Sequence, residues 1–140
     1  MNRSLLTSNR QDWETPDDLF KILDDEFHFT LDAAASDQNA KCKQYFTAKD
    51  DALTKKWGGV TFCNPPYGKQ IKKWVKKGYE EAMAGSTVVM LLPARTDTEW
   101  FHKYCLKGEI RFIKGRIRFK GAQYNAPFPS MVVVFRGERQ

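Results

Sequence analysis

The nine residues VTFCNPPYG, at positions 60–68, decide the fold expected of this chain. Residues 60–63 predict a short apolar strand, and Pro65 and Pro66 must end it, because proline lacks the N–H group that a central strand donates. Two successive prolines also make a rigid turn whose carbonyl oxygens have no competing N–H groups. The stretch therefore predicts a buried strand that ends in an acceptor-rich turn.

Strands and helices alternate on both sides of this turn. Thr15 and Pro16 predict a helix start, with Thr15 as the N-cap and Pro16 at the first helical position. Apolar side chains at helical spacing predict a helix over residues 71–83 that ends at Gly85. We expect further strands near 29–31, 87–92, 109–113 and 131–135, a short helix and an extended piece between 39 and 47, and a helix near 98–106. This alternation predicts an α/β fold with a mostly parallel sheet flanked by helices.

The composition predicts one compact domain. The chain has 140 residues, of which 41% are hydrophobic, so it can bury a core. We expect a single domain over 1–140, with loose ends at 1–11 and 137–140 and no separate target-recognition domain. No apolar run approaches the ~20 residues that a bilayer span needs. Three cysteines without a CxxC pair and only two histidines argue against a disulfide framework and a metal site.

The charges are divided unevenly along the chain. Residues 1–68 hold 8 basic and 11 acidic side chains, net −3, whereas residues 69–140 hold 15 basic and 6 acidic, net +9. Several lysines follow the turn on the helix face opposite its apolar stripe, and Arg116 and Arg118 alternate with apolar residues. These residues predict contacts with phosphates, and a solvated basic face is the plainer alternative.

The turn itself suggests a chemistry. The Asn64 side-chain oxygen and the Pro65 carbonyl can accept the two hydrogens of a planar amino group, and Tyr67 can stack on the attached ring. Accepting both hydrogens leaves the nitrogen lone pair more nucleophilic without a strong base. The turn therefore favours methylation of an exocyclic amine, the alternative being a turn that only ends a strand.

The chain resembles the phage-type, Dam-like DNA N6-adenine methyltransferase family along nearly its whole length. The resemblance implies a compact Rossmann-like fold that uses S-adenosylmethionine. It is carried by WxTP at 13–16, LDAAAS at 31–36, NxKC at 39–42, YFT at 45–47, DDAL at 50–53, Trp57, FCNPPYG at 62–68, LLPART at 91–96, WF at 100–101, GRIRF at 115–119 and PxPS at 127–130.

The resemblance also implies roles for individual residues. The catalytic turn that holds the target adenine comprises Asn64, Pro65, Pro66 and Tyr67. Small side chains after Asp32 take the place of the glycine-rich loop found in other methyltransferases. The residues expected to bind the cofactor are Thr15, Pro16, Asp32, Ala33, Ala34, Ser36, Phe46, Asp50, Asp51 and Asn64. Which of Asp50 and Asp51 meets the cofactor adenine or ribose is open at this point.

DNA is the partner that the resemblance implies. A paired adenine must leave the base stack before it can reach the turn. Phe119 stands where related enzymes place an aromatic side chain against the extruded base, and core packing is the alternative. The residues expected to contact DNA are Lys69, Lys72, Lys73, Lys76, Arg95, Arg116, Arg118 and Phe119.

Other functions remain open from the sequence. The acceptor could be another planar nitrogen, such as cytosine N4, an RNA base or a protein glutamine. The chain could also be a noncatalytic nucleic-acid-binding module, or a metal-dependent nuclease that uses Asp32, Asp50 and Asp51. Because no insertion is long enough to read several base pairs, specificity is short, relaxed or shared with a second subunit in a homodimer. A phage or prophage origin implies the bacterial cytoplasm.

Overall fold

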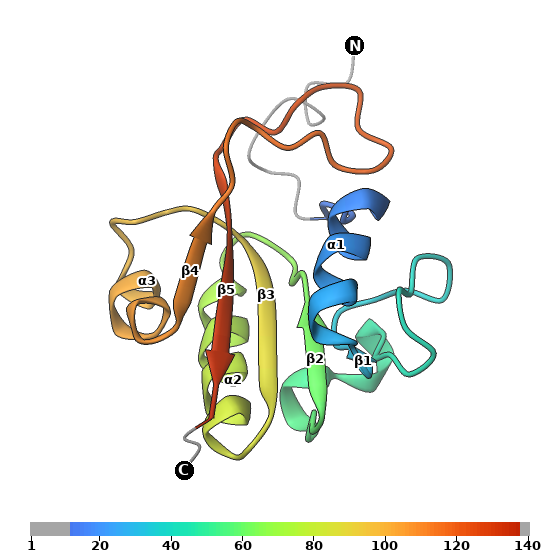
Figure 1. Ribbon diagram of the computed structural model, residues 1–140, viewed down its shortest axis with the longest axis vertical. Helices are drawn as coiled ribbons and strands as arrows, with labels where there is room; N and C mark the ends of the chain where they lie inside the picture. The colour runs from blue at the N-terminus through green and yellow to red at the C-terminus, as the bar shows by residue number, and fades with distance from the viewer. Residues whose placement is uncertain (1–11, 138–140) are drawn as a thin grey trace.

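The computed structural model describes residues 12–137 and contains a five-stranded sheet with the order β1-β2-β3-β5-β4 (Figure 1). The strands are β1 Leu31–Asp32, β2 Val60–Cys63, β3 Thr87–Pro93, β4 Glu109–Phe112 and β5 Ser130–Arg136. The helices are α1 Asp17–Phe27, α2 Ile71–Met83 and α3 Glu99–Lys103, with 3-10 turns η2 Ala48–Asp50, η3 Ala52–Thr54 and η4 Cys105–Lys107.

Helices α1 and α2 cover opposite faces of the sheet. Phe20 of α1 packs edge-on against Phe62 of β2, with ring centroids 5.2 Å apart. Gly78 of α2 lies so close to Val88 and Met90 of β3 that a Cβ atom there would clash with the Met90 sulfur. Since Phe62 is in register with Val89, the side chains of Val88 and Met90 point to the other face. In Figure 1, α1 accordingly lies in front of the strands and α2 behind them.

The sheet is mixed, so the expectation of a mostly parallel sheet was wrong. The β1–β2 and β2–β3 pairs are parallel, but β5 is antiparallel to both β3 and β4. Four strands therefore run in one direction and β5 runs against them. The reason lies in residues 113–129, which contain neither helix nor strand. Without a crossover helix, the chain reverses after β4, and β5 runs back beside it, between β3 and β4.

The N-terminal elements also differ from the expected ones. Pro16, with ψ 142°, is the N-cap and α1 begins at Asp17, so Thr15 is not the cap and Pro16 is not helical. The first strand covers Leu31–Asp32 rather than 29–31. Between residues 39 and 47 the expected short helix is absent, and Tyr45 makes a single bridge to Asp32.

Most of the ends expected to be loose lie outside the described residues, namely 1–11 and 138–140. Gly137 is described, and it is buried where an added Cβ atom would meet the carbonyl oxygen of Ala82. Within residues 12–137 no helix is long and apolar enough to cross a membrane.

Candidate active site

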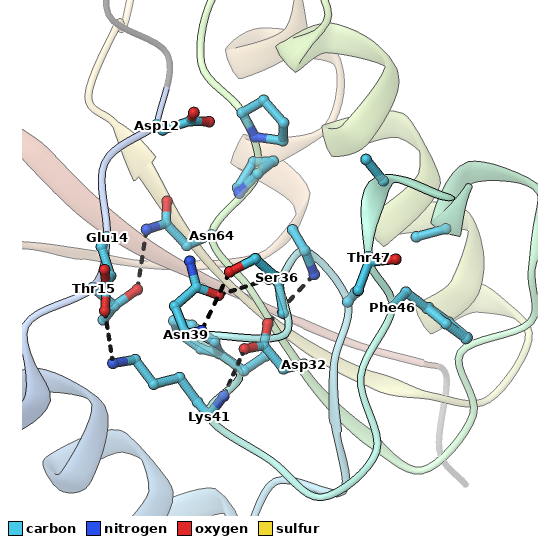
Figure 2. Close-up of a pocket in the computed structure, with 18 of the residues that line it drawn as sticks. Asp12, Glu14, Thr15, Asp32, Ser36, Asn39, Lys41, Phe46, Thr47 and Asn64 are labelled. Atoms are coloured by element: carbon cyan, nitrogen blue, oxygen red, sulfur yellow. Dashed lines mark hydrogen bonds and ion pairs between the residues drawn. The ribbon is translucent and has the colours of Figure 1, made fainter. Parts of the chain in front are cut away.

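A cavity of about 750 Å³ lies at the carboxyl ends of β1 and β2 (Figure 2). Its walls are the segment before α1, the loop after β1, the turn around η2 and the turn after β2. The loop after β1 and the turn after β2 follow parallel strands and therefore lie at the same edge of the sheet, which is where open α/β sheets bind ligands. Of the residues expected to bind the cofactor, Thr15, Asp32, Ala33, Ala34, Ser36, Phe46, Asp51 and Asn64 line the cavity, and Pro16 and Asp50 do not.

Asp32 ends β1 and is buried, with 3% of its surface exposed. Its two carboxylate oxygens accept hydrogen bonds from the backbone N–H groups of Ala34, at 3.3 Å, and Lys41, at 3.0 Å. Burial raises the pKa of Asp32 from 3.8 to about 6, although these hydrogen bonds and the Lys41 charge act in the opposite direction. The carboxylate therefore holds the loop after β1 in place, and its raised pKa lets it take up a proton at a higher pH than an exposed aspartate does.

A pair of reciprocal hydrogen bonds shapes the rest of that loop. The Ser36 backbone N–H donates to Oδ1 of Asn39 at 2.7 Å, and the Asn39 backbone N–H donates to the Ser36 hydroxyl at 3.2 Å (Figure 2). Asn39 also lines the cavity. It belongs to the NxKC motif but was not among the expected site residues.

The two neighbouring acids near η2 have different environments. Asp50 accepts hydrogen bonds from the backbone N–H of Thr47 at 2.8 Å and from its hydroxyl at 3.2 Å, which closes a capping box. Asp51 lines the cavity and has a left-handed backbone, with φ 55°. The indole of Trp57 holds this turn by donating to the Ala52 carbonyl at 3.0 Å. Geometry thus separates a structural acid, Asp50, from one that faces the cavity, Asp51.

Asn64 occupies the turn after β2 with its amide fixed in one orientation. The amide nitrogen donates to the Trp13 backbone carbonyl and, at 3.0 Å, to the Thr15 hydroxyl. Oδ1 is buried and has no hydrogen-bond partner among residues 12–137. A buried acceptor without a donor is unfavourable unless a ligand or a water molecule supplies the donor. The site therefore offers one acceptor for an N–H or O–H group.

Tyr67 and Phe119 lie in an aromatic cluster with Trp13 and Phe128. Tyr67 is 3% exposed and its hydroxyl donates to the Leu91 carbonyl at 3.0 Å. Burial raises the pKa of the Tyr67 phenol well above its usual range. Phe119 is 1% exposed and packs on Trp13 with ring centroids 5.3 Å apart. Both rings are core residues in this conformation, and contact of either with a base stays a prediction.

A second cavity, of about 380 Å³, adjoins the turn after β2 and shares Trp13 with the first. Two residues expected to contact DNA, Lys69 and Arg95, line it. The Arg95 guanidinium lies 5.7 Å from the ring centroid of Phe128. Cations and aromatic rings thus meet beside the turn.

The other expected DNA contacts lie on the surface. Lys72, Lys73 and Lys76 are exposed along α2. Arg116 and Arg118 are exposed while Ile117 and Phe119 are buried, so exposure alternates as expected, although no strand forms there.

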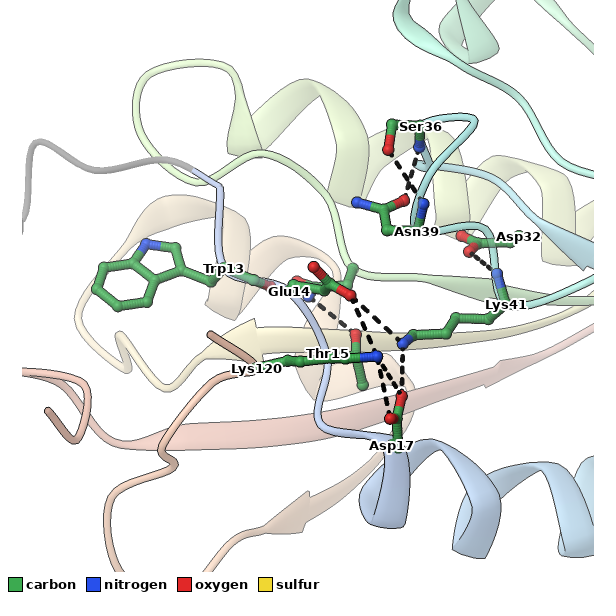
Figure 3. A network of polar contacts seen from close by, with 10 residues as sticks. Trp13, Glu14, Thr15, Asp17, Asp32, Ser36, Asn39, Lys41 and Lys120 are labelled. Atoms are coloured by element: carbon green, nitrogen blue, oxygen red, sulfur yellow. Dashed lines mark hydrogen bonds and ion pairs between the residues drawn. The ribbon is translucent and has the colours of Figure 1, made fainter. Parts of the chain in front are cut away.

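An ionic network at the mouth of the larger cavity was missed from the sequence (Figure 3). Lys41 and Lys120 approach the Asp17 carboxylate at 2.9 and 3.0 Å, and both also lie within 4 Å of Glu14. Hydrogen bonds from both lysines hold the pKa of Asp17 below its usual value. The network joins Asp17 of α1 to two lysines that lie 24 and 103 positions further along the chain. The spacing of residues in the sequence does not predict such contacts.

Comparison with known proteins identifies the family. A sequence profile described as "DNA N-6-adenine-methyltransferase (Dam)" matches residues 2–139. The DNA N-6-adenine-methyltransferase of Haemophilus phage HP1 is 30% identical over 140 residues, covering 91% of this chain and 80% of that protein. The protein of the same name from Escherichia phage T1 is 34% identical over 92 residues, covering 64% of this chain but only 38% of its relative. The chain belongs to the DNA N-6-adenine-methyltransferase (Dam) family.

Proposed function

We propose that this protein transfers the methyl group of S-adenosylmethionine to the N6 amine of adenine in DNA. The observation that carries the proposal is the buried, unpartnered Oδ1 of Asn64 at the edge of the larger cavity. An exocyclic amine is a hydrogen-bond donor and satisfies this oxygen. The names of the relatives from phages HP1 and T1 point to the same reaction.

The larger cavity suits the cofactor in size and chemistry. Its volume of about 750 Å³ lies within the ~300–1,000 Å³ usual for small-molecule sites. The small side chains of Ala33 and Ala34 leave room against the backbone, and the Asp51 carboxylate can accept hydrogen bonds from hydroxyl or amino groups. Phe46 offers an apolar surface for a ring. When bound, S-adenosylmethionine supplies a methyl group that a positively charged sulfur activates.

Asn64 and Pro65 act on the amine of the substrate. The Asn64 Oδ1 accepts one amine hydrogen and the Pro65 carbonyl accepts the other. Holding both hydrogens away from the ring system leaves the nitrogen lone pair available for attack. The protein thus contributes orientation and hydrogen bonding rather than a strong base.

DNA contacts are proposed for the basic residues around the turn. Lys72, Lys73 and Lys76 on α2 are exposed and can bind phosphates, as can Arg116 and Arg118. Lys69 and Arg95 lie at the smaller cavity, beside the turn. Because Tyr67 and Phe119 are buried, an extruded adenine can stack on either ring only if the aromatic cluster opens.

Assembly and location follow from the same proposal. The described residues form one five-stranded sheet, so we infer that reading several base pairs requires a second subunit or proceeds with relaxed specificity. A homodimer would supply the second subunit. The phage relatives favour the cytoplasm of a bacterial host as the place of action.

The test is to incubate the protein with DNA of mixed sequence and S-adenosylmethionine that carries a deuterated methyl group. The DNA is then digested and its nucleosides are analysed by mass spectrometry, with a reaction lacking protein as control. Labelled N6-methyladenine is the expected product. Labelled N4-methylcytosine alone would keep the amine mechanism but refute adenine as the substrate. No labelled nucleoside would refute the reaction and favour a noncatalytic module.

A further inference from the structure

We infer that Thr15 is a positioning residue for the reaction, because its hydroxyl helps to hold the Asn64 amide with Oδ1 toward the substrate amine. The inference rests on the proposed function and adds Thr15, which acts on the substrate amine only through Asn64. Its observation is the contact between Thr15 Oγ1 and Asn64 Nδ2, at 3.0 Å, beside an unpartnered Oδ1. Thr15 itself is 3% exposed.

An asparagine in a catalytic turn needs such a restraint. The two ends of a side-chain amide have nearly the same size, and rotation about the terminal bond has two nearly equivalent minima. A half-turn of the Asn64 amide would replace the acceptor by an NH₂ group, which cannot bind a donor amine. The Trp13 carbonyl can only accept, and therefore requires the nitrogen on its side. The Thr15 hydroxyl gives the second N–H its acceptor.

The segment that carries these two acceptors is itself anchored. The Trp13 ring packs against Phe119 and Phe128 at centroid distances of 5.3 and 5.2 Å. The Glu14 carbonyl accepts a hydrogen bond from the Lys120 backbone N–H at 2.9 Å, and the Lys120 side chain reaches Asp17 (Figure 3). Both acceptors are thus fixed relative to the turn after β2.

The position of Thr15 at the start of α1 supports this role over a capping role. Pro16, not Thr15, is the N-cap, and the first-turn N–H of Leu19 donates to the Asp18 carboxylate rather than to Thr15. The Thr15 hydroxyl bonds Asn64 instead of a helical N–H group. The Thr15 hydroxyl therefore stabilises the turn after β2 rather than the helix.

Kinetic measurements on three variants test the inference. Thr15→Val keeps the side-chain shape but removes the acceptor, and Thr15→Ser keeps the hydroxyl. Thr61→Val is the matched control, because Thr61 is a fully buried threonine of β2 whose hydroxyl donates to the Gly58 carbonyl at 3.2 Å. We expect Thr15→Val to lower kcat about tenfold at saturating cofactor and DNA, with little change in the KM for cofactor. Thr15→Ser should recover most of the rate, and Thr61→Val should leave it near that of the unmodified protein.

Nuclear magnetic resonance gives a readout that does not depend on activity. The side-chain amide signals of Asn64 in ¹⁵N-labelled protein are assigned by their disappearance in Asn64→Asp. We expect their hydrogen exchange to quicken roughly fivefold or more in Thr15→Val and to stay slow in Thr15→Ser. Unchanged exchange in Thr15→Val would overturn the contact.

The two measurements separate this inference from the proposed function. Unchanged kcat in Thr15→Val, with the unmodified protein active, would overturn the positioning role alone. If the unmodified protein methylates no DNA, the proposed function fails and the positioning role falls with it. The exchange rates then still report whether Thr15 holds the Asn64 amide.

Discussion

The side-chain amide of Asn64 donates a hydrogen bond to the backbone carbonyl of Trp13, across 51 residues of chain. This contact joins the segment before α1 to the turn after β2. The carbonyl can accept but not donate, so it decides which end of the amide faces the larger cavity. The acceptor on which the proposed chemistry depends is therefore a property of two distant segments together.

Asn64→Asp is expected to inactivate the protein even though a carboxylate can accept hydrogen bonds from an amine. One carboxylate oxygen must then face the Trp13 carbonyl, where neither atom can donate. We expect a methyl-transfer rate at least about tenfold lower and a loss of about 1–3 kcal/mol in the free energy of unfolding at pH 7. Single-turnover kinetics and urea unfolding measure both. A rate close to that of the unmodified protein would show that the Trp13 contact does not constrain this residue.

The two acids near η2 should differ in function. Asp51→Asn suits the left-handed backbone at this position and is expected to weaken cofactor binding about tenfold, because a charged acceptor in the cavity is lost. Asp50→Ala should cost about 1 kcal/mol of stability through the capping box and change the affinity much less. Titration calorimetry with S-adenosylmethionine distinguishes the two. A larger loss of affinity in Asp50→Ala would reverse the assignment.

Asp32 should make stability depend on pH. Its pKa is about 6 in the folded protein against an ordinary value of 3.8, so the folded state binds the proton more tightly than the unfolded state does. The protonated Asp32 therefore stabilises the folded state fully below about pH 4, and this stabilisation is lost as the pH rises through about 6. The free energy of unfolding falls by about 3 kcal/mol over this range. The Asp32→Asn variant has no ionisable group at this position, so its stability lacks this dependence on pH.

The difference in unfolding free energy between Asp32→Asn and the unmodified protein should therefore shift in favour of the variant between pH 4 and pH 7. Urea unfolding at both pH values measures this shift. A difference that stays constant over this range would contradict the raised pKa.

The lysines of α2 should contribute to the salt dependence of DNA binding. Each lost phosphate contact lowers the slope of log K against log salt by roughly 0.9, so Lys72→Gln/Lys73→Gln should reduce it by about 1 to 2. Lys55→Gln/Lys56→Gln removes the same charge from another exposed pair and serves as control. Fluorescence anisotropy at several salt concentrations gives the slopes. Equal slopes for the two double variants would assign the effect to overall charge.

The elements around the turn after β2 were predicted well. Residues 71–83 form α2 as expected, because apolar side chains recur at helical spacing and Gly85 follows. Strand β2 at Val60–Cys63 was also correct, since the prolines mark its end. Strand β3 extends one residue beyond the expected 87–92. Strong local signals thus suffice where burial and chain breakers agree.

The remainder depended on contacts between distant segments. Strand β1 has two residues and exists through its pairing with Thr61 and Phe62, which no local pattern encodes. The reversed direction of β5 follows from the path of 113–129, a segment without helical periodicity. Asp32 and Asn64 could be placed at one cavity because both end neighbouring strands. The Trp13 carbonyl could not be placed there, because every residue has a backbone carbonyl and no sequence pattern distinguishes this one.

The most direct test compares Asn64→Ala with the unmodified protein in two measurements on the same samples: affinity for S-adenosylmethionine, and single-turnover methyl transfer to DNA. We expect a nearly unchanged affinity and a transfer rate lower by at least about 100-fold, because the variant removes the acceptor for the target amine. Transfer that continues at a comparable rate would contradict the role of Asn64. A parallel collapse of cofactor affinity would show that Asn64 serves the cofactor rather than the amine.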